Sequence, residues 1–276
     1  MLYKSSIGIF ALVAAIGLAV GGASAFDDAT YPDWGGAWFR IGSGSYDPAK
    51  PYGLGQQAPL TPEYRKILET SLADQTKGGQ GENPGYLCTS HGMPRVMIAT
   101  IPIQFIVLPE TTYVYLERLS QIRRIYTDRR GWPAQLRHST LGTSIGRWID
   151  EDGDGRYDIL EVETRGIKSP HVYDASGIPF HRDEAAIVKE RIQLDKANPN
   201  VLRNDITTID NALTGPWTIT RTYGRTREYA WNPYTCAEDN QHVIIGKEDY
   251  MLSADGLLMP VRKDQPPPDL RNFEGR

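Results

Sequence analysis

An acidic loop carries the most distinct chemistry in the sequence. Asp150, Asp152 and Asp154 alternate along the chain, Gly155 follows them, and Asp158 stands at the ninth position of the run. Calcium is a hard cation that takes six to eight oxygen ligands, and carboxylates on alternate residues of a curled loop can converge on it. Without a cation these carboxylates would repel one another. The spacing therefore predicts a calcium-binding loop.

The residues on either side indicate which kind of calcium loop this is. An EF-hand has a helix on both sides, whereas residues 145–149 and 159–164 have the character of strands. The loop resembles the calcium loops between strands of integrin-type and other extracellular β repeats. By that resemblance the ligands are the carboxylates of Asp150, Asp152, Asp154 and Asp158 and the carbonyl oxygen of Arg156. Glu161 stands at position twelve, where strand alternation can turn it away. The ion would have a structural role, and the alternative is a solvated acidic hairpin tip.

Five further residues are candidates for catalysis. His181 and Asp183 come shortly before an expected strand, while Arg124, Tyr126 and Glu190 lie inside expected strands among apolar neighbours. A carboxylate in apolar surroundings has a raised pKa and can transfer protons near neutral pH. The alternative is that these strand residues lie on the wet outer face, as most charged residues do.

Two cysteines, Cys88 and Cys236, are the only ones in the chain. In an oxidising compartment such a pair most simply forms a disulfide. It would tie an early segment to a late one. The alternative is a reactive thiol.

Many short apolar and β-branched runs, separated by Gly, Pro, Asn and Asp, indicate an all-β, mainly antiparallel fold. We expect a lipocalin-like barrel or a sandwich. An amphipathic helix should precede it, beginning at Thr61-Pro62 and ending before Gly78. One short strand is possible at 36–41. The main expected strands are 96–100, 103–108, 111–118, 121–127, 145–149, 158–164, 187–194, 202–209 and 217–223.

The N-terminus predicts export. Lys4 precedes an apolar run at 7–20, and Ala23-Ser24-Ala25 is typical of a cleavage site. The apolar run is shorter than the roughly 20 residues that span a bilayer, so we expect a cleaved signal peptide, no stable membrane span afterwards, and a periplasmic or secreted protein. The net charge of −4 argues against nucleic acid as a partner. The expected organisation is a signal peptide at 1–25, an irregular lead-in with one helix at 26–85, a β-barrel-like domain at 86–262 and a tail at 263–276.

The order of motifs between Cys88 and Asn240 resembles a widespread family of exported bacterial proteins of uncharacterised function. The resemblance implies a shared β fold and a shared compartment. The strings that carry it are C-x3-GMPR at 88–95, QIRRIYTD at 121–128, GTSIGRW at 142–148, Glu190-Arg191, PWT at 216–218 and CAEDN at 236–240.

The chain departs from that family at several polar positions. The family usually has His where Thr143 stands, His-Pro in place of Trp132-Pro133, His-Ser in place of His181-Arg182, and a short turn in place of the acidic loop. These differences put any shared reaction in doubt for this chain.

Three functions fit these observations. A barrel can enclose a small hydrophobic or aromatic molecule. The second possibility is a periplasmic lyase, hydratase or isomerase that acts on such a molecule, and the third is an interaction module. The sequence favours the binding protein. The aromatic residues that could line its cavity are Tyr113, Tyr115, Tyr126, Trp148, Trp217 and Tyr223.

Overall fold

The computed structural model describes residues 28–42, 58–82, 88, 90–98, 102–117, 120–174, 176–232, 241–245, 248–269 and 271. The expected signal peptide and Cys236 lie outside the described residues. The Cys88–Cys236 disulfide therefore stays a prediction. None of the described helices combines the length and hydropathy needed to cross a bilayer.

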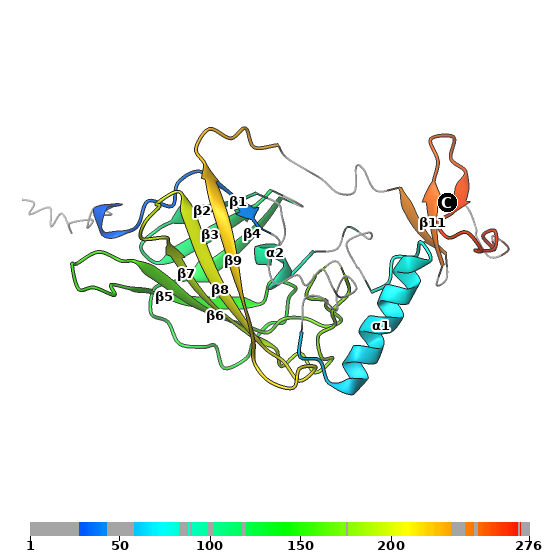
Figure 1. Ribbon diagram of the computed structural model, residues 1–276, viewed down its shortest axis with the longest axis horizontal. Helices are drawn as coiled ribbons and strands as arrows, with labels where there is room; N and C mark the ends of the chain where they lie inside the picture. Colours follow the sequence, from blue (N-terminus) through cyan, green and yellow to red (C-terminus); the bar gives the residue numbers. More distant parts are fainter. Residues whose placement is uncertain are drawn as a thin grey trace, which may run out of the picture.

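Nine strands close into a barrel in chain order, from β1 to β9 (Figure 1). The prediction of a mainly antiparallel barrel is confirmed, because every neighbouring pair is antiparallel except β4 and β5. The strands are β1 Ala37–Ile41, β2 Ile103–Val107, β3 Thr111–Leu116, β4 Gln121–Tyr126, β5 Thr143–Ile149, β6 Ile159–Arg165, β7 Ile187–Leu194, β8 Val201–Ile209 and β9 Trp217–Thr226. The barrel thus begins inside the expected lead-in and its last strand ends well before residue 262.

The barrel has one weak seam. β4 and β5 run parallel and pair only through Ile125–Ser144 and Tyr126–Ile145. Parallel neighbours need a long connection that returns the chain to the starting end, and residues 127–142 supply it here. Side-chain contacts between β4 and β5 therefore contribute more to closing the barrel than side-chain contacts between other neighbouring strands.

Buried and exposed residues alternate along the strands, and the buried ones form the core. On β3, Thr112, Val114 and Leu116 are buried, whereas Tyr113 and Tyr115 are partly exposed on the outer face. The period of two follows from strand geometry, which sends successive side chains to opposite faces of the sheet. The buried apolar residues of the strands join those of both helices in a single core cluster.

Helix α1 (Pro62–Thr76) confirms the expected amphipathic helix. It buries Tyr64 and Leu68 and ends before Gly78. A second helix, α2 (Arg95–Ile98), replaces the strand predicted at 96–100, and all four of its residues are buried. A short apolar run that is buried on all sides has no periodicity, so sequence alone does not distinguish helix from strand there.

A small antiparallel sheet that the sequence analysis missed follows the barrel. It consists of β10 (His242–Ile245), β11 (Glu248–Leu252) and β12 (Leu258–Pro260). Figure 1 shows it beyond the C-terminal end of α1, away from the barrel. Gln80 Nε2 lies 3.0 Å from His242 Nδ1, and Arg262 Nη1 lies 3.6 Å from an Asp74 carboxylate oxygen. These polar contacts connect the sheet to the region of α1.

Candidate functional site

Polar side chains, all of them buried except the half-buried Arg40, follow the inner wall of the barrel from β4 round to β1. Each is on the inward face of its strand, between apolar residues that belong to the core. We call this set the polar belt. Its members are Arg123, Ser144, Thr164, Glu190, Asn204, Arg221, Tyr223 and Arg40.

Arg123 is the centre of the polar belt. Its guanidinium forms an ion pair with Glu190, in which Nη1 donates to Oε1 at 3.1 Å and Nη2 donates to Oε2. Nε donates to Ser144 Oγ at 3.2 Å, and Nη2 also donates to Thr164 Oγ1 at 3.0 Å. Asn204 Nδ2 donates to Glu190 Oε1 at 2.9 Å. The Arg123 and Glu190 side chains are 1% and 0% exposed, so this is a fully desolvated pair.

The belt continues to helix α2 at the β9–β1 junction. The Tyr223 hydroxyl donates to the Met97 carbonyl oxygen. Arg40 Nη1 donates to the Ile98 carbonyl oxygen at 2.7 Å. The last carbonyl groups of a helix have no partner within the helix, so these two side chains hold α2 against the inner wall.

Several buried side-chain polar atoms have no hydrogen-bond partner within the described ranges of the chain, and four of them lie around Arg221. Buried polar groups in native proteins are nearly always paired, and an orphaned group costs about 1–3 kcal/mol. A concentration of such atoms in one region indicates a site where a bound water or ligand supplies the missing hydrogen bonds. Around Arg221 the atoms are Arg221 Nε, Arg40 Nε, Tyr173 Oη and Asn204 Oδ1, whereas others, such as Thr112 Oγ1 and Thr208 Oγ1, lie elsewhere on the inner wall.

Charge in the polar belt is unbalanced. The polar belt contains three arginines, Arg40, Arg123 and Arg221, but one carboxylate, Glu190. That carboxylate forms its ion pair with Arg123. Burial lowers the pKa of Arg221, and the nearby charge of Arg40 lowers it further. Burial also raises the pKa of Asp174, whose negative charge acts in turn to raise the pKa of Arg221.

The predicted catalytic residues do not come together. Glu190 faces the interior, but Arg124 is exposed on the outer face, with its guanidinium carbon 5.2 Å from the Tyr113 ring centroid. Tyr126 lies on the same outer face, 3.8 Å from the Arg130 guanidinium carbon. The inward arginine is the adjacent Arg123. The expectation of a site containing Arg124 and Tyr126 together with Glu190 is therefore corrected.

His181 and Asp183 form a separate pair on the segment before β7. His181 Nδ1 lies 2.9 Å from Asp183 Oδ2, and Asn211 Nδ2 donates to the same oxygen at 2.6 Å. Burial acts to raise the pKa of Asp183, but hydrogen bonds from the Ala185 N–H, Asn211 and His181 outweigh it and lower the pKa. The His181 N–H donates to Asp210 at 2.9 Å. These contacts stabilise the loops at this end of the barrel.

The predicted cavity aromatics divide between the two faces of the wall. Tyr113, Tyr115 and Tyr126 lie on the outer face. Trp217 and Tyr223 are buried in the core, and Trp148 packs against it. The interior lining is therefore less aromatic than the sequence analysis expected.

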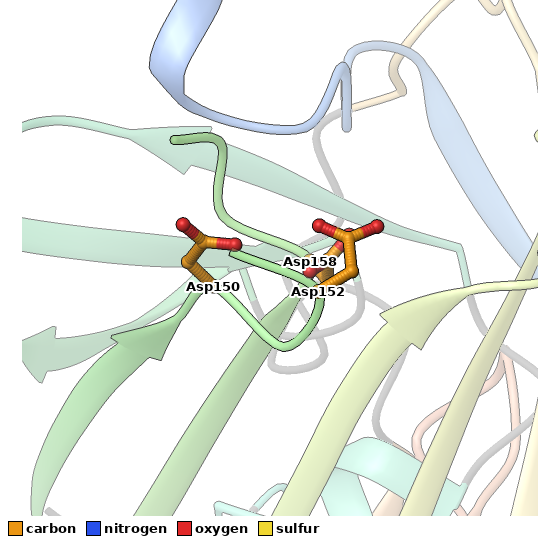
Figure 2. A group of neighbouring side chains, drawn as sticks. All are labelled: Asp150, Asp152 and Asp158. Carbon is orange, nitrogen blue, oxygen red and sulfur yellow. The ribbon is translucent and has the colours of Figure 1, made fainter. Parts of the chain in front are cut away.

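Three aspartates of the acidic loop approach one another between β5 and β6 (Figure 2). Carboxylate oxygens of Asp150, Asp152 and Asp158 all lie within 4.8 Å of one another. Asp150 accepts hydrogen bonds from the N–H groups of Gly153, at 2.7 Å, and Gly155, at 2.9 Å. Both glycines have positive φ, which allows the tight curl of the loop.

Other predicted ligands point elsewhere. Asp154 accepts the Arg156 N–H at 2.8 Å and is outside the group of three. Glu161 lies on β6, where Arg147 Nη2 donates to it at 2.7 Å and Arg191 Nη1 at 2.9 Å. Strand alternation has turned Glu161 to the outer face of the barrel, so its placement among the ligands is corrected.

Two hollows lie outside the barrel interior. A groove of about 690 Å³ runs over the outer face of β5 to β8, where charged residues such as Glu161 and Arg191 pair across strands. A smaller pocket of about 260 Å³ lies between α1 and residues 170–182, and His171 and Phe180 line it. The outer groove is too highly charged to suit an apolar molecule.

Sequence reasoning missed Arg40, Arg123, Tyr173 and Arg221. A signal for Arg221 was present, because alternation places it on the same face as Trp217, Ile219 and Tyr223. For Arg123 the signal was ambiguous, since Ile122 and Ile125 fall on opposite faces of β4. Tyr173 lies in an irregular segment that has no period to interpret.

Comparison with known protein families finds no match, and no curated protein matches the sequence. The similarity to exported bacterial proteins therefore remains an expectation from the motifs.

Breaking the ion pair of the polar belt should strongly destabilise the fold. Arg123→Met leaves the Glu190 carboxylate buried without its partner, which we expect to lower the free energy of unfolding by about 3–5 kcal/mol. Urea denaturation measures this change. The double variant Arg123→Met/Glu190→Gln should recover part of the loss. The adjacent, exposed Arg124→Met is the control and should cost no more than about 1 kcal/mol. Equal losses of unfolding free energy in Arg123→Met and Arg124→Met would contradict this account of the polar belt.

Acid should destabilise the protein through His171. Burial lowers the pKa of His171 to about 4, and the Arg95 charge adds to this, against a backbone hydrogen bond to Met93. Because the unfolded chain binds this proton near pH 6.5, stability from the neutral histidine is complete above that pH and is lost on acidification towards pH 4. Between pH 7 and 4.5 we expect wild type to lose about 2–3 kcal/mol more than His171→Gln. Urea denaturation of wild type and His171→Gln at both pH values measures this difference in stability loss. A stability loss between the two pH values that is identical in His171→Gln and wild type would refute the assignment.

Proposed function

We propose that this is an exported binding protein that holds a small, largely apolar molecule inside the barrel. The observation that carries the proposal is the group of buried polar atoms around Arg221 that have no hydrogen-bond partner among the described residues. Ligand sites in proteins combine an apolar lining with a few placed polar groups. The polar belt supplies such groups, and the surrounding core cluster supplies the lining.

The Arg123–Glu190 pair supports binding over catalysis at this site. Both oxygens of Glu190 accept hydrogen bonds from Arg123, and Asn204 donates a further bond to Oε1. A general base needs a free lone pair within hydrogen-bond reach of the proton that it removes. Three of the roughly four lone-pair sites of Glu190 are already used in holding the wall together. The separation of His181, Asp183 and Arg124 from it adds to this argument.

Export fits the same proposal. The N-terminal leader predicts that the mature chain works in the periplasm or outside the cell. In that setting a soluble barrel can carry or sequester a molecule that is poorly soluble in water. The Cys88–Cys236 disulfide predicted for an oxidising compartment would add a covalent link.

The acidic loop is proposed as a structural calcium site at the β5–β6 turn. Its support is the convergence of Asp150, Asp152 and Asp158. A site of modest affinity would be filled outside the cytoplasm, where calcium is abundant. The ion would offset two of the three carboxylate charges and fix the turn.

Retention of a ligand tests the main proposal. The protein, expressed with its own leader and purified from the periplasm or the medium, is denatured and the released small molecules are identified by mass spectrometry. Thr208→Phe places a ring on the inner face of β8, whereas Thr207→Phe adds the same ring to the outer face. We expect wild type and Thr207→Phe to release the same apolar molecule and Thr208→Phe to release at least tenfold less. Circular dichroism checks that both variants fold. No enriched molecule in the wild type would overturn the proposal.

Calcium should stabilise the protein. If the dissociation constant lies at about 0.1–1 mM, then 10 mM calcium should add about 1.5–3 kcal/mol to the free energy of unfolding. Thermal denaturation with calcium or with a chelator measures the change. Asp150→Asn should abolish most of it. Asp255→Asn, which alters an exposed aspartate of another turn, should leave it intact. A calcium response that survives Asp150→Asn would place the ion elsewhere.

A further inference from the structure

We infer that the molecule bound in the barrel is an apolar monocarboxylate whose carboxylate lies between Arg40, Arg221 and Tyr173. This inference rests on the proposed binding function and specifies the chemical class of the ligand. It follows from which atoms are unpartnered, from how the strands place them, and from the charge around them.

Strand register brings Arg40 and Arg221 together. Arg40 on β1 is directly opposite Tyr223 on β9, and Arg221 is two residues from Tyr223 on the same face. Diagonal neighbours of this kind in an antiparallel pair lie about 7–8 Å apart. The Arg40 charge is close enough to lower the pKa of Arg221. Two guanidinium groups therefore share one part of the interior.

Neither arginine forms an ion pair with a carboxylate of the described residues, although Asp174 is close enough to raise the pKa of Arg221. Arg40 donates from Nη1 to the Ile98 carbonyl oxygen, and Arg221 donates from Nη1 to the Thr220 carbonyl oxygen at 3.3 Å. Nε of each is buried and has no hydrogen-bond partner in the part of the chain that the structure describes, and the Arg221 side chain is buried while that of Arg40 is half-buried. A buried guanidinium is stable only when an anion and hydrogen-bond acceptors compensate its desolvation.

Tyr173 supplies a third donor beside them. Its hydroxyl is buried and has no hydrogen-bond partner among the described residues, and the residue is 2% exposed. Arg221 and Tyr173 are close enough for each to perturb the pKa of the other. The unpartnered atoms of this trio are all donors: two Nε–H groups and one O–H group. A carboxylate has two oxygens with lone pairs enough to accept all three bonds.

The surroundings of the trio select an apolar body for the ligand. The Tyr173 ring packs against Trp217 with centroids 4.5 Å apart, and Ile219 lies between Trp217 and Arg221 on the inner face of β9. Asn204, opposite Arg221 on β8, presents an unpartnered Oδ1 that would repel a second anionic group. One carboxylate on an apolar or aromatic frame fits this arrangement.

Matched probes test the inference. 2-Naphthoate and its neutral analogue 2-naphthalenemethanol are titrated into the purified full-length mature protein, after removal of retained molecules, by isothermal titration calorimetry. We expect the carboxylate to bind about tenfold to hundredfold more tightly than the alcohol, as charge-assisted hydrogen bonds imply. Arg221→Met should abolish this preference. Arg203→Met removes an equal charge from the outer face of β8 and should preserve it.

A stability measurement separates ligand binding from a structural role. Without ligand, Arg221→Met should melt at or above the temperature of wild type, because it removes a buried charge that has no carboxylate partner. A large loss of stability in this variant would overturn the inference. Equal binding of the two probes would overturn it and leave the binding function standing. If neither probe binds, the inference also fails. Retention of a neutral molecule by the native protein would then preserve the binding function, and retention of nothing would end both.

Discussion

The buried ion pair between Arg123 and Glu190 is the interaction on which the barrel depends. β4 and β5 are joined by only two residue pairs, so the backbone does little to close the wall there. Arg123 reaches across this seam to Ser144 and Thr164 and then to Glu190 on β7. One guanidinium thereby ties together four strands. An arginine suits this task because its planar fork donates in several fixed directions at once.

The Arg123–Glu190 pair uses the one carboxylate of the polar belt, which leaves the belt with more positive than negative charge. Glu190 compensates Arg123, while Arg40 and Arg221 remain on the opposite part of the polar belt with unpartnered Nε atoms. A purely structural barrel would more simply have apolar residues at those positions, since a buried charge without a partner is costly. The arrangement is intelligible if the compensating acid arrives with the ligand. Closure of the wall and recognition of the ligand then follow from one polar belt.

Much of the fold could be predicted from the sequence, and the candidate site only in part. Alternation located nearly all barrel strands, and Thr61-Pro62 marked the start of α1. The all-buried α2 was mistaken for a strand, because a helix buried on every side has no amphipathic period. Glu190 was singled out correctly as a residue inside a strand. Its partner was sought at Arg124 because the isoleucines of β4 fall on both faces and leave the register open. Arg40, Tyr173 and Arg221 come together only when the barrel closes. The long-range strand pairing that closes it cannot be predicted from local sequence patterns.

The central claim is that the barrel interior beside α2 is a ligand site. A high-resolution crystal structure of the protein purified from its native compartment tests it most directly. The account predicts electron density for a small molecule inside the barrel, with a carboxylate within hydrogen-bond distance of Arg221 Nε and Arg40 Nε. An interior filled by protein side chains alone, with the Arg221 guanidinium bonded to a protein carboxylate, would contradict it.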